Sequence, residues 1–450
     1  MRGRTWRTAL ATLALVAAGG ILATCSSNNS TSPPSGGDIT EINHVVVIYM
    51  ENHSFDNLYG EFAGANGLAE AGTAPKQLNQ SGTAYTTLPQ KPSSPYPSNL
   101  PNAPFYIGDY VPVNDPTPDM VHRFYQEQSQ INGGAMNKFV AVSDALGAVM
   151  GYYHTSGLPV ASLAAQYTLC DNFFHSAFGG SFLNHQWLIA AASPTVPNAP
   201  ASIVAVLDQS GHMVTDGIVT PDGYAVNTAY SVNAPHPTGT SPQELVPNQT
   251  NPTIGDRLDG KGVTWAWYAG GWDNALAGHP DPLFQFHHQP FVYYTNYADG
   301  TAAKAQHLLD ESKFISAAQA GTLPSVSFVK PLGLDDEHPG YANILTGEQH
   351  VLQLVNAVKN GPNWKDVAII ITYDENGGSW DHVAPPTGDR WGPGTRVPTI
   401  IISPFAKTGF VDHTQYETLS ILGFIEKRWG LEALGSRDAA ANPFTNAFQF

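Results

Sequence analysis

The chain has 450 residues, of which 42% are hydrophobic and 11% aromatic, enough to build a large buried core. Charged residues make up only 13%, whereas Gly (43) and Pro (35) are plentiful, which predicts long loops that are ordered by packing. The 20 Lys and Arg against 37 Asp and Glu give a net charge of −17, which argues against a nucleic-acid partner because such a partner requires a basic face.

The N-terminus has the pattern of an export signal. A basic stretch, MRGRTWR, precedes the apolar run TALATLALVAAGGILA, and the polar run SSNNSTSPPSGG follows. The apolar run is short for a membrane-spanning helix, so residues 1–24 are predicted to be a signal peptide and residues 25–41 a flexible linker. Cys25 lies in a stretch that resembles a bacterial lipoprotein box, although the preceding Thr24 departs from the usual small residue.

Two outcomes of export stay open at Cys25. Lipidation would anchor the protein to a membrane, whereas ordinary cleavage would leave it periplasmic or secreted. In either case the other cysteine, Cys170, has no expected partner, so no disulfide framework is predicted. The sequence does not indicate the oligomeric state.

Beyond the linker, the pattern is that of one α/β domain, residues 42–450. Continuous runs rich in Val and Ile predict strands covered on both faces, at 44–50, 325–331, 366–373 and 397–403. Helical patterns occur at 158–167, 185–192, 348–359 and 414–430. The stretches 84–118 and 193–253 lack periodicity and are predicted to be long loop insertions. We therefore expect a mostly parallel central sheet with helices on both faces.

Acidic and imidazole side chains follow three of the predicted strands. The first strand ends in Glu51-Asn52, the second precedes LGLDDEHPGY, and the third ends in YDENGGSWDH with Asp374 and Glu375. A separate stretch, FQFHHQPF, contains His287 and His288. Because chemistry in open α/β sheets gathers beyond the carboxyl ends of the strands, these side chains are predicted to converge on one edge.

Each group also has a plainer interpretation. Asp374 and Glu375 could form a turn before two glycines, the histidine pair could be packed in the core, and the acids at 335–337 could be a solvated charge run. Their joint occurrence favours a site. Oxygen ligands on Glu51, Asn52, Asp374 and Glu375 suit one divalent cation such as Mg²⁺, Ca²⁺ or Mn²⁺, and the imidazoles keep Zn²⁺ or iron open.

The stretch FGGSFLNHQW supplies a candidate nucleophile. Two glycines precede Ser181 and a helical pattern follows it, so its hydroxyl is expected near a helix N-terminus that favours an anion. The stretch is not the G-x-S-x-G turn of esterases. The plainer interpretation is a serine that caps the helix. A serine beside a divalent metal at an anion-binding helix start suits phosphoryl transfer better than acyl transfer.

Taken in order, ENHSFDNLYG, GGSFLNHQW, HHQP, DDEHPGY, YDENGGSWDHVAPP and VDHTQYETLSILGFIEKRWGL make the chain resemble a known family. It is the bacterial phosphoesterase family that holds phosphatidylcholine-type phospholipases C and the AcpA-like respiratory-burst-inhibiting acid phosphatases. The resemblance runs from about residue 42 to the end. It implies an alkaline-phosphatase-like α/β fold with a serine or threonine nucleophile that becomes phosphorylated.

The resemblance also implies roles for individual residues. Ser181 is the implied nucleophile and touches the metal ion, whose other implied ligands are Glu51, Asn52, Asp374 and Glu375. Asn52 also contacts the phosphate. The histidines that bind the phosphoryl group or protonate the leaving oxygen are then His338, His288 and, in PDMVHRFYQEQ, His122. The doublet leaves open whether His287 or His288 faces the substrate.

Two departures from the family pattern bear on these roles. The commoner first motif has Arg where His53 stands, so His53 is given no role. The family's phospholipases usually have Thr at the position of Ser181, and GGSFLNHQ looks like the acid phosphatase branch. The resemblance thus predicts an exported, metal-dependent acid phosphatase that acts on small phosphate monoesters.

Two alternatives are kept. The first is a phospholipase C that cleaves phosphodiester head groups. Phospholipases of the family typically carry a further C-terminal region, and its absence here disfavours this alternative. The second is a phosphate- or metal-binding lipoprotein without turnover, which leaves Ser181 and the histidines unexplained.

Overall fold

The computed structural model describes residues 37–450, so the predicted signal peptide and Cys25 lie outside the described residues. The described part of the predicted linker contains a short 3-10 helix, Ile39–Glu41. Between residues 37 and 450, no helix is both long and apolar enough to cross a bilayer.

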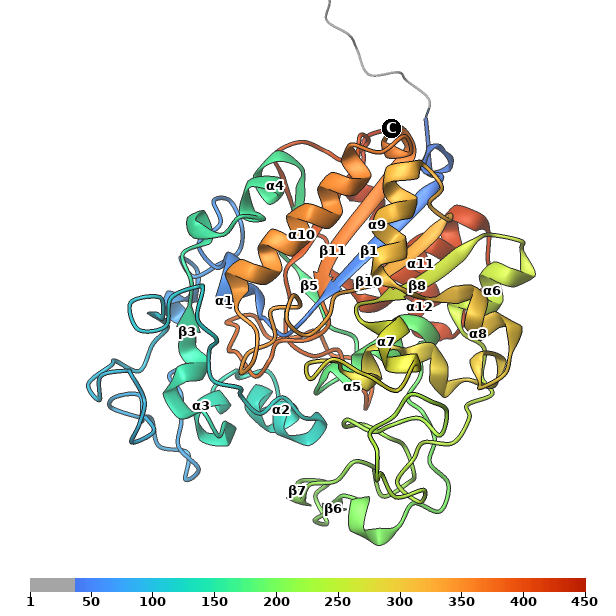
Figure 1. Ribbon diagram of the computed structural model, residues 1–450. Coiled ribbons are helices and arrows are strands. Elements are labelled where there is room, and N and C mark those ends of the chain that lie inside the picture. The colour runs from blue at the N-terminus through green and yellow to red at the C-terminus, as the bar shows by residue number, and fades with distance from the viewer. Residues whose placement is uncertain (1–36) are drawn as a thin grey trace, which may run out of the picture. The chain divides into compact units, whose positions relative to one another are not determined.

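The centre of the molecule is an eight-stranded sheet with the order β13-β4-β12-β11-β1-β10-β8-β9 (Figure 1). The strands are β1 (His44–Met50), β4 (Thr168–Cys170), β8 (Trp265–Ala269), β9 (Leu308–Asp310), β10 (Val326–Lys330), β11 (Val367–Tyr373), β12 (Thr399–Ile402) and β13 (Phe410–Asp412). Neighbouring strands are parallel except where β12 pairs with β11 and β4. The predicted α/β class with a mostly parallel sheet is confirmed.

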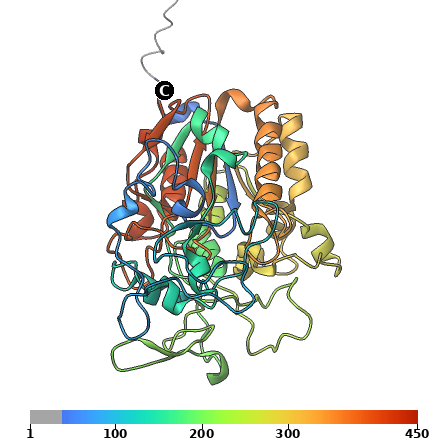
Figure 2. The ribbon, with the colours of Figure 1, turned by 90° about the vertical axis from the view of Figure 1, so that its left-hand side faces the viewer.

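Twelve α-helices are present in the described chain, and some of them cover both faces of this sheet. The twelve are α1 (Phe55–Tyr59), α2 (Phe124–Ile131), α3 (Phe139–Val142), α4 (Ala161–Gln166), α5 (Ser181–Ala190), α6 (Ile254–Gly260), α7 (Trp272–Leu276), α8 (Ala302–His307), α9 (Glu311–Ala320), α10 (Ile344–Lys359), α11 (Thr418–Trp429) and α12 (Ser436–Ala440). Helices α9 and α10 lie on one face and α11 on the other, as the side view in Figure 2 shows. Because both faces are covered, β10 and β11 are buried along their whole length, which explains why their sequences are mostly apolar.

The four predicted strands are all present as β1, β10, β11 and β12, with ends that shift by one or two residues at most. The four predicted helices correspond to α4, α5, α10 and α11. Helix α5 begins at Ser181 instead of residue 185. Strands β4, β8, β9 and β13 are not among the predicted strands, because β4, β9 and β13 have three residues each and β8 is built from the aromatic run WAWYA. The ten-residue helix α9 and seven shorter helices are also not among the predicted ones.

The two predicted loop insertions carry little regular structure. Residues 84–118 contain only the short strand β2 (Phe105–Tyr106), which pairs with β3 (Gly151–Tyr152). Residues 193–253 contain the small hairpin of β6 (Val206–Leu207) and β7 (Met213–Thr215). In Figure 1 the hairpin lies at the end of the molecule towards which β1, β10 and β11 point.

Candidate active site

The register of the central strands brings the motifs after the first and third predicted strands together. Met50 of β1 pairs with Tyr373 of β11, so the next residues, Glu51 and Asp374, leave the sheet side by side. The backbone N–H of Asp374 donates to the carbonyl of Met50 at 3.1 Å, which continues this pairing one step past the strands. Both carboxylates are fully buried. The predicted convergence on one edge of the sheet therefore follows directly from strand pairing.

Ser181 is the first residue of α5 and its side chain faces these motifs. Its Oγ donates to Glu51 Oε2 at 2.8 Å and lies 3.5 Å from Asn52 Oδ1. The residue at the N-cap position is Gly180, and no side chain caps the helix. The interpretation of Ser181 as a capping serine is therefore wrong, and its hydroxyl is held by groups from β1 instead.

Several buried carboxylate oxygens at this edge have no hydrogen-bond partner: Asp374 Oδ2, Glu375 Oε1 and Asp336 Oδ2. Burial, and then the negative charge of Glu51, raises the pKa of Asp374 well above its usual range, and burial with Asp374 does the same for the pKa of Glu375. Unpaired buried carboxylates are costly unless a cation compensates them. The residues present therefore fit the predicted divalent metal ion.

Lys330, which was not singled out in the sequence, supplies a positive charge to the site. It is the last residue of β10, is fully buried, and its ammonium hydrogen-bonds Glu51 Oε1. Burial opposes ionisation of Glu51, but Lys330 and His288 hold its pKa well below the usual range. A lysine at the carboxyl end of a strand was the available signal, because it stands at the same edge as the acidic motifs.

The predicted histidines fall into two groups. His122 and His338 lie at the opening of the site, with ring centroids 5.5 Å apart and side chains that are 19% exposed for His122 and nearly buried for His338. In both rings Nδ1 donates to a backbone carbonyl, of Met120 and Pro339 respectively, so that Nε2 of His122 can accept from the Asn52 amide. His122 Nε2 lies 3.3 Å from Asn52 Nδ2 and 3.8 Å from Glu375 Oε1.

The second group, His287 and His288, is buried on the 3-10 helix Phe286–His288. His288 Nε2 lies 2.9 Å from Glu51 Oε1, although not in line for a hydrogen bond, and His287 stacks edge-on against His288 at 4.6 Å. His288 is thus the member of the doublet that reaches the motif residues. Burial, followed by the nearby Lys330, lowers the pKa of His288 to about 4. His288 is therefore neutral near neutral pH and is a poorer proton donor than expected.

The acidic stretch at 335–337 is not a solvated charge run, because Asp336 and Glu337 are buried. The carbonyl of Asp336 accepts from the backbone N–H of Glu51 at 2.9 Å. Glu337 has a left-handed φ of 76° and accepts from the Tyr373 hydroxyl at 2.8 Å. Its carbonyl lies 3.1 Å from Nε2 of His53, so the role of His53 is to tie this loop to the first motif.

Two glycines allow the loops to approach this closely. Gly377 has a φ of 59°, and a Cβ there would lie 2.4 Å from the carbonyl oxygen of Asn52. Gly179 has a φ of 85°, and a Cβ there would lie 2.4 Å from the backbone nitrogen of Phe124. Only glycine combines this conformation with this contact.

A buried arginine holds two of the motif loops together. Arg396, three residues before the start of β12, donates from Nε to Asp381 Oδ1 at 2.9 Å and from Nη2 to Asp56 Oδ1 at 3.2 Å. Asp56 Oδ2 also accepts from Nδ1 of His382 at 2.7 Å. Asp56 belongs to the segment of Asn52, and Asp381 to the segment of Glu375. Asp381 and His382 therefore support the site without lying in it.

A polar cavity of about 250 Å³ opens at Gly180, the residue before Ser181. Its lining residues include His122 and Gly180 from the site, together with Asp119, Arg123, Asp144 and Asn227. Arg123 is paired with Asp216.

The model of the phosphoesterase family matches residues 42–432. The chain belongs to the phosphoesterase family. Membership confirms the resemblance drawn from the motifs and makes the chain a phosphoric ester hydrolase. The alternative of a binding lipoprotein without turnover is therefore not supported.

This phosphoesterase is similar to several curated phospholipases C. Phospholipase C A of Mycobacterium tuberculosis is 26% identical over 457 residues, which cover 93% of this chain and 79% of that protein. Non-hemolytic phospholipase C of Pseudomonas aeruginosa is 26% identical over 464 residues, which cover 92% and 58%. Non-specific phospholipase C5 of Arabidopsis thaliana is 24% identical over 459 residues, which cover 91% and 74%.

Among solved structures, the phosphoesterase is similar to a protein in the alkaline phosphatase superfamily from Vibrio parahaemolyticus. The TM-score is 0.36 at 10% sequence identity, and the match covers 74% of this chain and 73% of that chain.

Proposed function

We propose that this phosphoesterase hydrolyses phosphate monoesters by double displacement, with Ser181 as the nucleophile that becomes phosphorylated. The position of the Ser181 hydroxyl carries this proposal. The side chain is 95% buried, does not cap its helix, and donates to a carboxylate that a buried lysine keeps ionised. The uncapped first turn of α5 offers free N–H groups to an anion at the same place.

The first step joins Ser181 Oγ to phosphorus as the bond from phosphorus to the substrate's alcohol oxygen breaks. The Ser181 proton can leave along its hydrogen bond to Glu51 Oε2. Asn52 is held in a left-handed conformation, with a φ of 60°, that directs its side chain towards Ser181 and His122. Positioning of this kind lowers the entropic part of the barrier.

A divalent ion held by Asp374, Glu375, Asn52, Glu51 and Ser181 would supply the positive charge that stabilises a serine alkoxide and the phosphoryl oxygens.

His338 is the proposed acid for the leaving oxygen. Its Nδ1–H is fixed on the carbonyl of Pro339, so the proton on Nε2 of the imidazolium faces away from the backbone. Transfer of this proton gives the alcohol product. Water then attacks phosphorus, breaks the bond to Ser181 and releases inorganic phosphate, and the serine recovers its proton.

The small polar cavity at Gly180, the residue before Ser181, favours monoesters with a compact leaving group. A second candidate is a phospholipase C acting on diester head groups, which the names of the curated relatives favour. The two differ in one comparison. We expect kcat/KM for p-nitrophenyl phosphate to exceed that for p-nitrophenylphosphorylcholine by at least about tenfold, or about 1.4 kcal/mol. A diester preference at every pH would replace the monoesterase by the phospholipase.

The nucleophile is tested by Ser181→Ala. We expect kcat to fall by several orders of magnitude, and acid quench of the wild type during turnover to trap one phosphate on Ser181 by intact mass and peptide mapping. Ser176→Ala is the matched control, because Ser176 is also buried but donates to Glu417 at 2.8 Å, away from the site. The control should lose about 1 kcal/mol of stability and keep its turnover. A fully active Ser181→Ala enzyme would refute the proposed role.

A further inference from the structure

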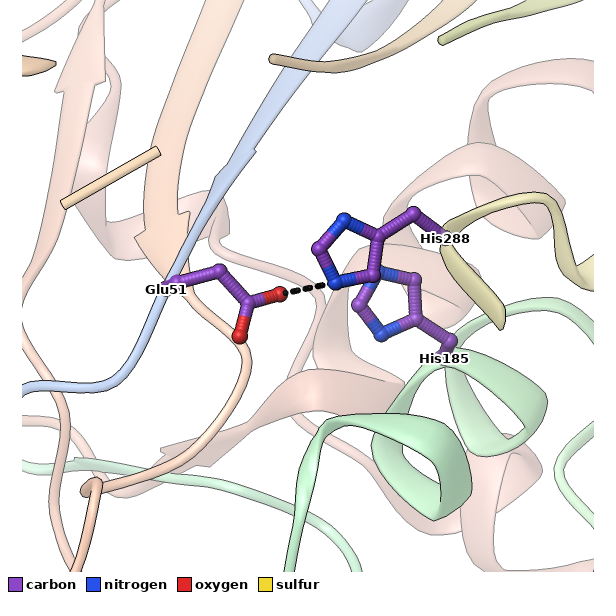
Figure 3. A group of neighbouring side chains, drawn as sticks. All are labelled: Glu51, His185 and His288. Carbon is purple, nitrogen blue, oxygen red and sulfur yellow. Dashed lines mark ion pairs between the residues drawn. The ribbon is translucent and has the colours of Figure 1, made fainter. Parts of the chain in front are cut away.

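Three buried side chains meet beneath the nucleophile: Glu51 after β1, His185 on α5 and His288 on the 3-10 helix that ends with it (Figure 3). One ligand atom from each lies within 4.8 Å of the other two. Glu51 and His185 are fully buried, and His288 is 3% exposed. No role was predicted for His185 from the sequence.

Both imidazoles have a buried ring nitrogen that is available to a metal ion. His185 Nδ1–H donates to the carbonyl of Ser181 at 2.7 Å, which fixes the tautomer and leaves a lone pair on Nε2. That Nε2 atom is buried without a partner. The His185 and His288 rings are stacked almost parallel, with an interplanar angle of 2° and centroids 5.0 Å apart, and neither nitrogen of His288 makes a hydrogen bond.

The donor set differs from that of the oxygen-rich metal position at Asp374 and Glu375. Two imidazoles and one carboxylate suit ions of the Zn²⁺ and Co²⁺ class better than Mg²⁺ or Ca²⁺. Lys330, however, already places its ammonium on Glu51 Oε1, the same oxygen that lies 2.9 Å from His288 Nε2. An amine and a metal ion cannot both occupy this corner of the carboxylate.

We propose that Glu51, His185 and His288 form a second cation position in which the Lys330 ammonium stands in for a metal ion. The native chain therefore holds one divalent ion, at the oxygen-rich position. Removing the amine, while keeping the three ligands, converts the position into a site for a transition-metal ion.

Cobalt titration of the full purified chain tests this proposal, because Co²⁺ held by two imidazoles in a low-coordinate site absorbs visible light far more strongly than Co²⁺ held by oxygen ligands. We expect the wild type to bind one Co²⁺ per chain with weak absorption. Lys330→Met should bind two, the second with strong absorption. Lys330→Arg keeps the positive charge and should bind one.

Binding of the second Co²⁺ must depend on His185, the ligand to which no role was assigned from the sequence. In the Lys330→Met background, His185→Phe should return the stoichiometry to one Co²⁺ and remove the strong band. If Lys330→Met does not fold, Lys330→Ala, which also removes the amine and leaves Glu51 Oε1 free for a metal ion, is titrated with the same expected outcome. One Co²⁺ per chain in the folded neutral variants, or two in the wild type, would overturn the proposal.

The proposal shares Glu51 with the proposed phosphoesterase mechanism, but the two tests are separate. Stoichiometry and the spectrum of Co²⁺ are read without substrate, so an inactive wild type with the expected titrations would count against the mechanism alone. An active wild type whose neutral Lys330 variants bind one ion would count against the second cation position alone.

Discussion

The Glu51 carboxylate connects a charged group, the Lys330 ammonium, with a neutral one, the Ser181 hydroxyl. One oxygen accepts from the Lys330 ammonium and the other from the Ser181 hydroxyl, so a single carboxylate connects a fixed charge to the candidate nucleophile. Its neighbours Asp374 and Glu375 have no comparable partner among the described residues. The carboxylates of the site therefore differ in charge compensation. Glu51 is paired with a lysine, whereas Asp374 and Glu375 need a bound cation to balance their charge.

Replacing one of these carboxylates tests the requirement. We expect Asp374→Asn to bind the divalent ion more weakly and to lose most of its activity, because a charge is removed from the cation's surroundings. Saturating metal should stabilise the wild type by about 2.7 kcal/mol at a concentration one hundred times Kd, and this gain should shrink in the variant. Thermal unfolding with and without metal measures this stabilisation in the wild type and in the variant.

The control for this substitution is Asp335→Asn, because Asp335 stands in the neighbouring acidic stretch but is only half-buried. Its metal-dependent stabilisation should equal that of the wild type. Full turnover of metal-stripped Asp374→Asn, with the metal content checked by elemental analysis, would contradict the proposed metal dependence.

The pH profile depends on His338. Burial, opposed by the charge of Glu51, lowers the pKa of His338 below its ordinary value of 6.5. If the imidazolium is the acid, activity is present below the folded-state pKa and is lost as pH rises through it, which gives an acid optimum. We expect the alkaline limb of kcat/KM to fall below about pH 6.5 and to be absent in His338→Asn.

Leaving groups separate this role from a structural one. An alkyl phosphate needs protonation of its leaving oxygen, whereas p-nitrophenolate leaves readily without it. His338→Asn should therefore lower the rate with the alkyl phosphate by about 10²–10⁴-fold and affect p-nitrophenyl phosphate much less. Equal losses with both substrates would assign His338 a positioning role.

At the level of elements, the sequence predicted where the site lies better than how it is assembled. Mostly apolar runs rich in Val and Ile identified β1, β11 and β12, the shorter run VSFVK identified β10, and the polar residues after β1 and β11 identified the edge. The register that sets Met50 opposite Tyr373 could not be predicted, because it depends on which strand is the neighbour. The reversed direction of β12 was equally hidden, since a buried antiparallel strand has the same apolar pattern.

Lys330 and His185 show the same limit inside elements. A lysine that ends the run VSFVK looks like the polar end of a strand, and a histidine in SFLNHQWLIA looks like one more packed side chain. Their roles arise because folding brings Lys330 onto Glu51, and His185 close to Glu51 and His288, which are far away in the chain. Short or aromatic strands such as β8 could not be predicted for a different reason. Their apolar runs are too brief to show the hydrophobic periodicity that separates a strand from a helix.

The arginine that joins the motif loops gives a prediction at this scale. Arg396→Met leaves Asp56 and Asp381 buried without their counter-charge, so we expect a loss of about 3–5 kcal/mol in the free energy of unfolding. Arg390→Met is the control, because Arg390 pairs with Asp222 in an exposed position and should cost at most about 1 kcal/mol. Urea denaturation measures both, and equal losses would show that the buried network is not what stabilises the loops.

The net charge acts on the molecule as a whole. A formal charge of −17 repels a phosphate dianion before it reaches the local positive groups of the site. Raising ionic strength from low to physiological values should therefore increase kcat/KM for p-nitrophenyl phosphate by roughly twofold and leave kcat unchanged. The zwitterionic p-nitrophenylphosphorylcholine should respond less. A decrease with salt for the dianion would indicate that local positive charge dominates the encounter.

The two ends of the described chain lie together on the side of the sheet away from this chemistry. Gly37 is close enough to Phe450 that a Cβ added to it would be 3.1 Å from the Phe450 Cβ, and β1 runs from this side towards Glu51. Figure 1 shows the C-terminus at the end of the sheet opposite to α5. We therefore expect that attachment near residue 37 or at Phe450, to a surface, an affinity handle or a fused partner, leaves the candidate site facing outward. The enzyme could then be immobilised through either position while its substrate still reaches the site.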